Sequence, residues 1–357
     1  MRCLTLADAL RVQGAHCHFI SRAHPGHLME VIRQRGHMAN SLSAPVQKEQ
    51  AAVKEIASTN QLAHAPWLCS TWQTDAQETA PVLASLKPDW LVVDHYALDK
   101  RWEEALGAYY RKLLVIDDLA DRLHSSDLLL DQNLGRQPQD YASLVPERCQ
   151  VLTGPSYALL RPEFSALRPY SLQRREAQPG LRQLLISMGG VDKTNATGKV
   201  LLALKACTLP ADCLISVVMG LTAPWFHSVK EFAAQMPWAT EVLVNVNDMA
   251  QRMADSDLAI GAAGSTSWER CCLGLPTLMV VLADNQRGIA SSAEFAGAAI
   301  VLDINNGAQF AGLLKSSIAS LAQNETALTS LSRAAATVTI GCGTSLIAAH
   351  MLGKHPL

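Results

Sequence analysis

Two turns in the second half of the sequence have the residue types that bind phosphate groups. In the segment from Ile186 to Leu204, an apolar run leads into Gly189 and Gly190, and a helix is expected to begin near Asn195. Paired glycines let backbone N–H groups approach an anion, and a helix start favours negative charge. The segment matches neither a GxGxxG dinucleotide pattern nor a GxxxxGK(S/T) P-loop, which disfavours NAD and ATP as ligands. It predicts either a phosphate-binding turn or a plain connection between a strand and a helix.

The second turn lies within the segment from Asp257 to Gln286 and consists of Gly264, Ser265, Thr266 and Ser267. Its hydroxyls, together with the free N–H groups of the helix that follows, form a natural seat for a diphosphate. Glu269 lies one turn into that helix and can accept two hydrogen bonds from the 2′,3′-diol of a ribose. It can equally act as a capping-box glutamate for the serines before it.

Three further residues suit the recognition of a sugar phosphate. Asn285 and Gln286 end the next expected strand, where an amide pair can bind sugar hydroxyls, or where the two residues simply cap a loop. Arg161 closes the segment GPSYALLRPEF, at a point where its guanidinium can bind a phosphate. An exposed hinge arginine is the alternative.

Asp94, His95 and Tyr96 follow an apolar run in the first half of the sequence, and Asp117 and Asp118 follow the next one. A histidine between an aspartate and a tyrosine suits acid–base chemistry, because its pKa lies near physiological pH. A purely structural histidine is the alternative. Acidic residues at strand ends lie where open α/β sheets bind ligands, although each of them can also cap a helix.

These residues are positioned by short apolar runs that alternate with helical segments. This pattern is typical of an α/β fold with parallel sheets covered on both faces. Residues 161–182 interrupt it with three prolines and a cluster of charges, which is typical of a linker. We therefore predict two Rossmann-like domains, 1–160 and 183–357, joined by this linker, with the last helices packing back on the first domain. The predicted strands are 16–21, 90–94, 113–117, 128–131, 184–188, 213–219, 241–246, 258–261, 277–282 and 300–303.

Composition supports a folded protein of two domains. The chain has 357 residues, of which 49% are hydrophobic and 17% are charged, and its formal net charge of −2 argues against a nucleic-acid partner. Nine scattered cysteines without a CxxC or a zinc-like spacing indicate reduced thiols in the cytoplasm and no metal site. No apolar run approaches the ~18–20 residues of a membrane span. We expect no cofactor, and a monomer.

Taken together and in this order, the segments resemble the UDP-2,4-diacetamido-2,4,6-trideoxy-β-L-altropyranose hydrolases, the UDP-sugar hydrolases of pseudaminic acid biosynthesis. The resemblance covers nearly the whole chain, most weakly residues 37–85 and those after 305. It implies a GT-B-like fold, related to the peptidoglycan N-acetylglucosaminyl transferase, with two Rossmann-like domains facing across a cleft. The segments that carry it are MRCLTLADAL, DHYALD…WE, VIDDLADR…DLLLDQN, GPSYALLRPEF, ISMGGVDKTN and DLAIGAAGSTSWERCCLGLPTLMVVLADNQ.

The resemblance also implies a reaction and a role for each residue. Water attacks the anomeric carbon with inversion and releases UDP, without a metal. Gly189, Gly190 and the turn from Gly264 to Ser267 hold the diphosphate, and Glu269 holds the ribose. Arg161 contacts the substrate, Asn285 and Gln286 approach the sugar, and Asp94, His95 and Tyr96 shape the sugar side of the cleft.

Two departures from the family keep other functions open. The family begins with a strand and a turn of the type GxGHxxRCLxLA, and its histidine is the proposed base. The chain's first residues align inside that motif, so the resemblance implies that the histidine lies ahead of Met1. The amphipathic helix expected from residue 1 up to a stop at Gly14, with Leu4, Ala7 and Leu10 at helical spacing, accordingly has no leading strand. The family also has an arginine after a GxG, whereas Gly341-Cys-Gly343 is followed here by Thr344. A glycosyltransferase with the same UDP site and a non-catalytic UDP-sugar-binding protein are the alternatives.

Overall fold

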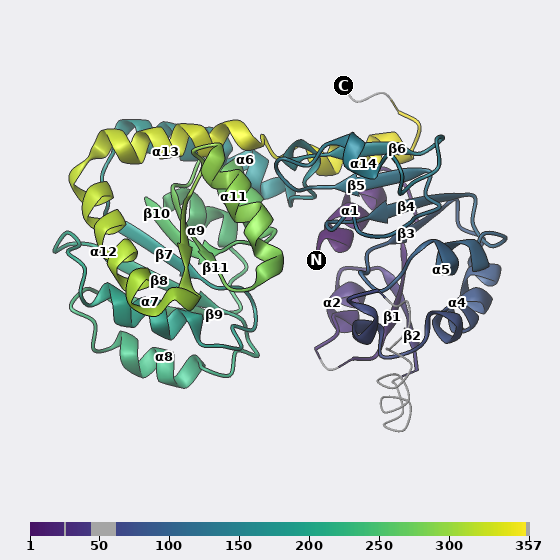
Figure 1. Cartoon of the computed structure of the whole chain (residues 1–357), viewed down its shortest axis with the longest axis horizontal. Helices are drawn as coiled ribbons and strands as arrows, with labels where there is room; N and C mark the ends of the chain where they lie inside the picture. The colour runs from purple at the N-terminus through teal and green to yellow at the C-terminus, as the bar shows by residue number, and fades with distance from the viewer. Residues whose placement is uncertain (25, 44–61, 355–357) are drawn as a thin grey trace. The chain divides into compact units, whose positions relative to one another are not determined.

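The computed structural model of the chain describes residues 1–24, 26–43 and 62–354 (Figure 1). They form two compact units, each with its own sheets and core. Unit 1 comprises Met1–Leu159 together with Gly343–Leu357, and unit 2 comprises Leu160–Cys342.

Unit 2 is built on one parallel sheet of six strands in the order β12-β11-β10-β7-β8-β9. The chain starts in the middle with β7, adds β8 and β9 on one side, and then crosses over to place β10 on the other side of β7. The strand order therefore reverses between β7 and β10, and open α/β sheets bind ligands at such a reversal, beyond the carboxyl ends of the strands. The strands are β7 (Gln183–Ser187), β8 (Leu214–Met219), β9 (Thr240–Val244), β10 (Leu258–Ala262), β11 (Thr277–Val281) and β12 (Ile300–Asp303).

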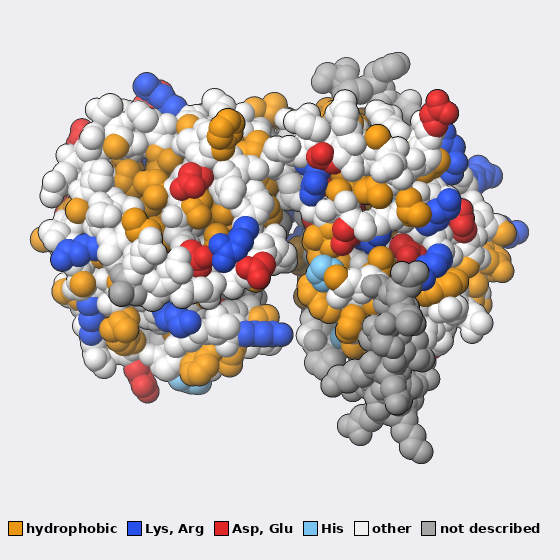
Figure 2. Space-filling view, in the orientation of Figure 1, with side chains coloured by type: hydrophobic (Ala, Val, Ile, Leu, Met, Phe, Trp, Pro, Cys, Tyr) orange, Lys and Arg blue, Asp and Glu red, His pale blue; other side chains and the backbone are white. Residues whose placement is uncertain are grey.

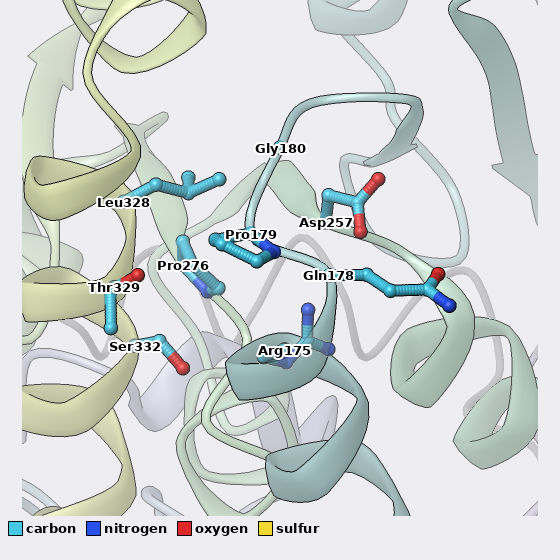
Figure 3. A pocket seen from close by; sticks show the side chains of 9 residues that line it. All are labelled: Arg175, Gln178, Pro179, Gly180, Asp257, Pro276, Leu328, Thr329 and Ser332. Atoms are coloured by element: carbon cyan, nitrogen blue, oxygen red, sulfur yellow. The ribbon is translucent and has the colours of Figure 1, made fainter.

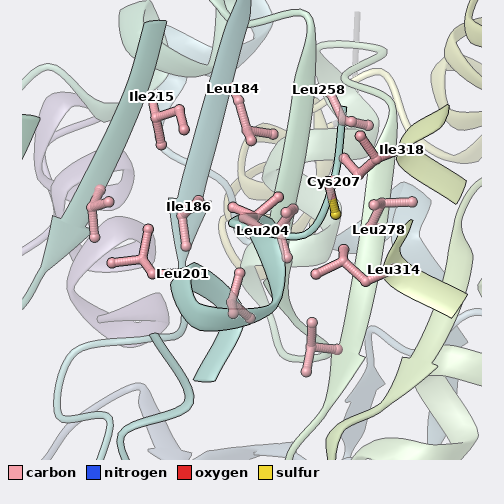
Figure 4. Close-up of a cluster of buried hydrophobic side chains, with 14 of the residues drawn as sticks. Leu184, Ile186, Leu201, Leu204, Cys207, Ile215, Leu258, Leu278, Leu314 and Ile318 are labelled. Atoms are coloured by element: carbon pink, nitrogen blue, oxygen red, sulfur yellow. The ribbon is translucent and has the colours of Figure 1, made fainter. Parts of the chain in front are cut away.

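Helices cover both faces of this sheet, as the continuous apolar strands require. Figure 4 shows Leu184 and Ile186 of β7 packed with side chains of α7 and α12 on one face. On the other face, Met279 and Val281 pack against alanines of α11. The helices are α6 (Pro162–Ala177), α7 (Ala196–Leu204), α8 (Phe226–Ala233), α9 (Met249–Asp255), α10 (Thr266–Cys272), α11 (Arg287–Phe295), α12 (Gly307–Gln323) and α13 (Glu325–Val338), with short 3-10 turns η4 (Asp284–Gln286) and η5 (Ile304–Asn306).

Unit 1 contains two separate parallel sheets among its described residues. One pairs β1 (His18–Arg22) with β2 (Met38–Leu42), and the other has four strands in the order β3-β4-β5-β6. α1 and α14 pack on one face of the larger sheet, and α4 and α5 pack on the other. The remaining elements are β3 (Trp90–Val93), β4 (Lys112–Ile116), β5 (Leu128–Asp131), β6 (Gln150–Thr153), α1 (Arg2–Val12), α2 (Met29–Gln34), α4 (Trp72–Leu86), α5 (Lys100–Ala105), α14 (Gly343–Met351), η1 (Ala65–Leu68), η2 (Pro138–Tyr141) and η3 (Pro155–Tyr157).

The predicted strands and the first helix are present, but the predicted linker is wrong. Residues 162–177 form helix α6 of unit 2, because Pro162 occupies the first helical position, where its missing N–H costs nothing, and Pro179 lies beyond the end. The predicted second domain ended at residue 357 with its last helices packing back on the first domain, and in the structure Gly343–Leu357 belongs to unit 1. Strand β2 was not predicted within residues 37–85, and residues 44–61 of that stretch lie outside the described part.

One stretch, Glu325–Met351, has the length and apolar composition of a candidate membrane span, with a mean hydropathy of 1.3. This corrects the expectation that no apolar run approaches that length. However, 50% of the window is buried inside the protein, and the stretch is divided between α13 of unit 2 and α14 of unit 1. Apolar helices with this burial are typical of protein cores.

On the face shown in Figure 2, basic and acidic side chains are interspersed.

Candidate functional site

The two glycine-containing turns lie side by side in unit 2, at the point where the strand order reverses. Gly189 and Gly190 follow β7, and Gly264 follows β10, the strand paired directly with β7. The last paired residues are Gly261 and Ser187, so both turns leave the sheet at its carboxyl edge. The structure thus brings together two segments that lie far apart in the sequence.

The turn after β7 exposes its backbone. Gly189 has a φ of 91°, a conformation that favours glycine, and Gly190 packs so closely on Gly220 that a Cβ at Gly220 would collide with its carbonyl oxygen. A Cβ at either Gly189 or Gly190 would meet nothing within 4 Å. Both N–H groups lack an acceptor among the described residues. The turn therefore presents free donors to open space.

The helix that follows this turn does not add to an anion site. The Asp192 carboxylate accepts hydrogen bonds from the N–H groups of Ala196 (2.7 Å) and Thr197 (2.9 Å), and Asn195 Oδ1 accepts from Gly198 N (3.0 Å). The start of α7 is thus already occupied by a carboxylate of the chain itself. The expectation that this helix start favours a phosphate is wrong, and only the backbone of the turn remains available.

The turn after β10 has both exposed and structural hydroxyls. Ser265 and Thr266 are exposed, whereas Ser267 is buried and its Oγ accepts a hydrogen bond from Arg270 (3.0 Å). Helix α10 begins at Thr266 without a side-chain cap from Ser265. Of the predicted hydroxyl groups, those of Ser265 and Thr266 are therefore free to contact a ligand, while Ser267 holds the turn in place.

Arg270 holds the turn after β10 through hydrogen bonds at both of its ends. It was not identified from the sequence as a site residue. It is buried, donates to the carbonyl of Ala262 (2.8 Å) and to Ser267, and occupies the space over Gly261, where a Cβ would collide with its guanidinium. Burial lowers its pKa to about 10, and it forms no ion pair with any described carboxylate. A buried cation that no described carboxylate contacts directly favours an anion on the adjacent turn, beside the more distant charge of Glu269. Arg270 could not be found from the sequence because its role depends on the space left over Gly261, which only the fold shows.

Glu269 is a half-buried carboxylate that forms no hydrogen bond within the described part of the chain. Burial raises its pKa to about 7, against the positive charges of Arg161 and Arg270. Glu269 is not part of a capping box, because a capping box requires a side-chain cap from the N-cap residue and Ser265 makes none. An acceptor that is partly desolvated and unpaired is suited to a ligand that donates hydrogen bonds.

Arg161 lies near Glu269 but is paired elsewhere. It precedes α6, forms an ion pair with Glu163 (2.9 Å) and lies over the ring of Phe164, 5.2 Å from its centroid. Its charge still lowers the pKa of Glu269, which places it in the same electrostatic environment. Arg161 is thus an ion-paired residue whose charge also acts on Glu269.

Asn285 and Gln286 lie in η4, directly after β11, and β11 pairs with β10. Gln286 turns back on its own strand, since its Oε1 accepts a hydrogen bond from the N–H of Leu282 (3.0 Å). Asn285 is exposed and has no hydrogen bond to a described residue. The structure therefore places both residues at the carboxyl edge, but only Asn285 has an uncommitted side chain.

Asp94, His95 and Tyr96 in unit 1 point to different partners. Asp94 accepts two hydrogen bonds from Arg2 (2.7 and 3.0 Å), and these hold its pKa below the usual range although burial acts to raise it. His95 Nδ1 accepts from the N–H of Ala97 (3.0 Å), and burial lowers its pKa. Tyr96 donates to Asp118, 2.6 Å away. The three side chains do not form a proton relay.

The other strand-end carboxylates of unit 1 are also paired. Asp117 is fully buried against Arg122 (2.7 Å), and the hydroxyl of Tyr141 lies 3.0 Å from Asp117 and 2.8 Å from Asp131. Burial raises the pKa of Asp131 to about 6, although it also binds Arg136 (2.7 Å). These contacts have the character of a structural network. Within the described residues, no group of three or more His, Cys, Asp or Glu side chains is placed to hold a metal ion.

A small cavity of unit 2 lies at the opposite edge of the sheet (Figure 3). Gly180, Asp257 and Pro276, which line it, precede β7, β10 and β11, respectively. It holds about 10 Å³, at most the space of one water molecule. Arg175 of α6 also lines it, and its guanidinium donates to the backbone carbonyl of Met253 (2.8 Å). The cavity is therefore a packing feature, and the carboxyl edge remains the candidate site.

Known proteins resemble this chain in sequence over part of its length. Residues 223–340 match the C-terminal domain of glycosyltransferase family 28. The chain is 27% identical over 206 residues to the UDP-2,4-diacetamido-2,4,6-trideoxy-β-L-altropyranose hydrolase of Campylobacter jejuni, covering 57% of this chain and 70% of that one. It is 30% identical over 156 residues to the spore coat polysaccharide biosynthesis protein SpsG of Bacillus subtilis, covering 43% of this chain. The matched part spans 44% of the length of SpsG and of one further curated relative.

Solved structures establish the fold. The structure of MurG from Acinetobacter baumannii superimposes with a TM-score of 0.63 over 95% of this chain and 100% of that one, at 17% identity. Together with the family 28 match and the parallel sheets, this similarity shows that the chain has an α/β, GT-B-like fold.

Proposed function

We propose that the chain binds the UDP part of a nucleotide sugar at the carboxyl edge of β7 and β10 and hydrolyses a UDP-linked diacetamido-trideoxy sugar to UDP and the free sugar. The observation that carries the proposal is Glu269, an unpaired, half-buried carboxylate beside two exposed turns at the reversal of strand order. The similarity to the Campylobacter jejuni hydrolase supports the choice of substrate class.

The diphosphate is assigned to the backbone of the two turns. The N–H groups of Gly189 and Gly190 and the hydroxyls of Ser265 and Thr266 are free donors that can surround its oxygens. The buried guanidinium of Arg270 adds positive charge behind the second turn. Negative charge grows on the diphosphate when it leaves the sugar, so donors fixed in advance lower the barrier as well as binding the substrate.

The ribose is assigned to Glu269. A 2′,3′-diol donates two hydrogen bonds, and only the ionised carboxylate accepts both. Because burial raises the pKa of Glu269 to about 7, the unliganded protein is partly protonated at neutral pH, and binding of the diol displaces that proton.

In the proposed reaction, a water oxygen forms a bond to the anomeric carbon while the bond from that carbon to the diphosphate oxygen breaks. The electron pair leaves with UDP, the attacking water gives its proton to bulk water, and the configuration inverts. The role on the sugar side predicted for Asp94, His95 and Tyr96 stays a prediction, and their present partners favour a structural role.

Transfer of the sugar to an acceptor is the second candidate, favoured by the match of residues 223–340 to a glycosyltransferase domain. UDP release from a UDP-diacetamido-sugar, measured with and without candidate acceptors, separates the two reactions. Hydrolysis predicts release that does not depend on an acceptor, and transfer predicts release only with one. UDP binding without release in either arm would contradict both enzymes and leave a binding protein.

Glu269→Gln tests the site itself. Loss of a charge-assisted acceptor is worth ~1.5–3 kcal/mol, so UDP affinity should fall by about 10- to 150-fold. Glu231→Gln is the matched control, because Glu231 is an exposed glutamate on α8 of the same unit. Equal affinities for UDP in both variants would remove Glu269 from the site.

A further inference from the structure

The loop after β8 packs against the turn after β7. Gly220 directly follows β8, and β8 is paired with β7. A Cβ added to Gly220 would come nearest to the carbonyl oxygen of Gly190, and next to the carbonyl carbon and Cα of that residue. The carbonyl of Gly190 therefore points at Gly220, and only a residue without a side chain leaves room for it.

The direction of this carbonyl fixes the direction of a donor. In a trans peptide the C=O and the N–H of the next residue point in opposite directions, and all peptide bonds of the described residues are trans. The N–H of Val191 thus points away from Gly220 and from β8, and β10 lies on the other side of β7. No described residue accepts a hydrogen bond from this N–H. Val191 therefore adds a free backbone donor to those of Gly189 and Gly190.

Trp225 holds the other end of the same turn. Its indole Nε1 donates a hydrogen bond to the carbonyl of Lys193 (3.1 Å). Lys193 lies between Gly190 and the start of α7, two residues before the cap residue Asn195. The turn after β7 is thus tied to the loop after β8 at two points, the carbonyl of Gly190 and the carbonyl of Lys193.

The loop that carries Trp225 is itself fixed. The carbonyl of Trp225 accepts hydrogen bonds from the N–H of Val229 (2.9 Å) and from the hydroxyl of Ser228 (3.0 Å), and Ala223 is buried in the core of unit 2. The Trp225 side chain, by contrast, is 41% exposed and belongs to no core cluster of the described residues. Packing of the core therefore does not account for its contact with the turn.

Such support matters for a turn that contains two glycines. A glycine backbone is free to adopt many conformations, and ordering it when a ligand binds costs free energy. Donors that are fixed before binding avoid this cost and also stabilise charge that develops on a leaving group. Contacts that fix the turn without occupying its donors therefore favour binding of an anion.

We propose that the loop after β8 positions the turn that receives the diphosphate, with Gly220 and Trp225 as the positioning residues. Gly220 sets the direction of the Val191 N–H, and Trp225 anchors the turn through Lys193. Neither residue is assigned a contact with the ligand. This inference rests on the proposed function, because that function supplies the diphosphate.

Affinities for UDP and for uridine, measured on the same variants, test this role. Uridine has the ribose diol assigned to Glu269 but no phosphate, so a residue that acts only through the phosphate turn affects UDP binding alone. Trp225→Phe keeps an aromatic ring and removes the indole donor, so the Kd for UDP should rise about three- to tenfold while the Kd for uridine stays within about twofold. Trp238→Phe is the matched control, because Trp238 packs on the core of the same unit, and it should leave both values unchanged.

Gly220→Ala tests the second contact. Its Cβ would collide with the carbonyl of Gly190, so the turn must shift and the Kd for UDP should rise about tenfold or more, again with little change for uridine. Melting temperatures of the variants, measured without ligand, show that each of them is folded.

Two results would overturn the proposal. Equal rises in the Kd for UDP and for uridine in Trp225→Phe would mean that Trp225 supports unit 2 as a whole and not this turn. Native affinity for UDP in both Trp225→Phe and Gly220→Ala would mean that the loop does not position the donors. Failure of the proposed function is distinguishable because it shows in the native chain: UDP that binds no more tightly than uridine would remove the diphosphate from the turn, and this role with it.

Discussion

The two units have polar residues at corresponding ends of similar sheets, but these residues differ in whether they have partners. In unit 2, Gly189, Gly190 and Glu269 have donors or acceptors that no described residue uses. In unit 1, Asp94 and Asp117 are bound by arginines at 2.7 Å. Buried polar groups are normally paired, so unpaired ones indicate a ligand and paired ones indicate structure. The comparison therefore assigns nucleotide binding to unit 2.

The largest expected effect comes from breaking the network of unit 1. Asp117→Ala leaves the buried Arg122 without its buried ion-pair partner and removes a partner of Tyr141, which should cost ~3–5 kcal/mol of unfolding free energy in urea titrations. Asp121→Ala is the control, because Asp121 also binds Arg122 (3.0 Å) but is exposed, and should cost less than ~1 kcal/mol. Similar small losses in both variants would mean that the network of unit 1 is not structural.

The second largest effect is expected from Gly264→Ala, which should weaken nucleotide binding without changing the stability of the fold. Gly264→Ala adds a methyl group that meets no atom within 4 Å, so folding should be unaffected, but the methyl lies where a diphosphate would approach. UDP affinity measured by calorimetry should fall about tenfold, equivalent to ~1.4 kcal/mol. Gly288→Ala on α11 is equally unhindered and should bind UDP like the native chain. Unchanged affinity in Gly264→Ala would separate this turn from the ligand.

The raised pKa of Glu269 predicts that ligand binding by unit 2 depends on pH. Since the ionised form binds the diol and the pKa is about 7, affinity for a UDP-sugar should rise about tenfold between pH 6 and pH 8. A UDP-sugar is the suitable ligand because its diphosphate does not titrate in this range. Glu269→Gln should show no such rise. A native chain with the same flat profile would contradict an ionised Glu269 in the complex.

The same raised pKa predicts a stability cost in the unliganded protein. The folded state holds the proton of Glu269 up to about pH 7, whereas the unfolded state releases it near the ordinary glutamate pKa of 4.5. Unfolding therefore becomes easier as pH rises through that interval. Glu269→Gln should raise the melting temperature at pH 8 but not at pH 4. A lower melting temperature at pH 8 would show that Glu269 has a stabilising partner.

The smallest effect is expected at His95. His95→Asn keeps a side-chain acceptor for the N–H of Ala97, so UDP affinity should stay within about twofold and the fold should be retained. A loss of UDP release at unchanged UDP affinity would contradict the structural role of His95, because it would show that a residue of unit 1 takes part in the reaction.

Much of the fold was predictable because interior strands are short continuous apolar runs. Leu128–Asp131 was predicted with the bounds that the structure shows, and all its residues are buried. Strand β2, by contrast, is mostly exposed and has few apolar residues, so it gave no such signal. Helix α6 looked like a linker because its stability depends on distant partners. Arg168, for example, donates to the carbonyls of Cys272 and Ala336.

The candidate site was predictable as far as its segments but not its side-chain contacts. The turns after β7 and β10 could be found from glycine and hydroxyl residues that follow apolar runs. Their adjacency depends on the strand order, and the burial of Arg270 depends on the absence of a side chain at Gly261. Asp94, His95 and Tyr96 suggested acid–base chemistry because they are neighbours in sequence, but their side chains bind three different partners, which only the structure shows.

Hydrogen exchange with and without UDP tests the central claim most directly. We predict that UDP, at a concentration near its Kd for the native chain, slows exchange in residues 186–192 and 262–270 of unit 2. Glu269→Gln should remove most of this change at the same UDP concentration, and the segments after β3 and β4 of unit 1 should not respond. Protection by UDP that leaves both turns of unit 2 unchanged would contradict the account.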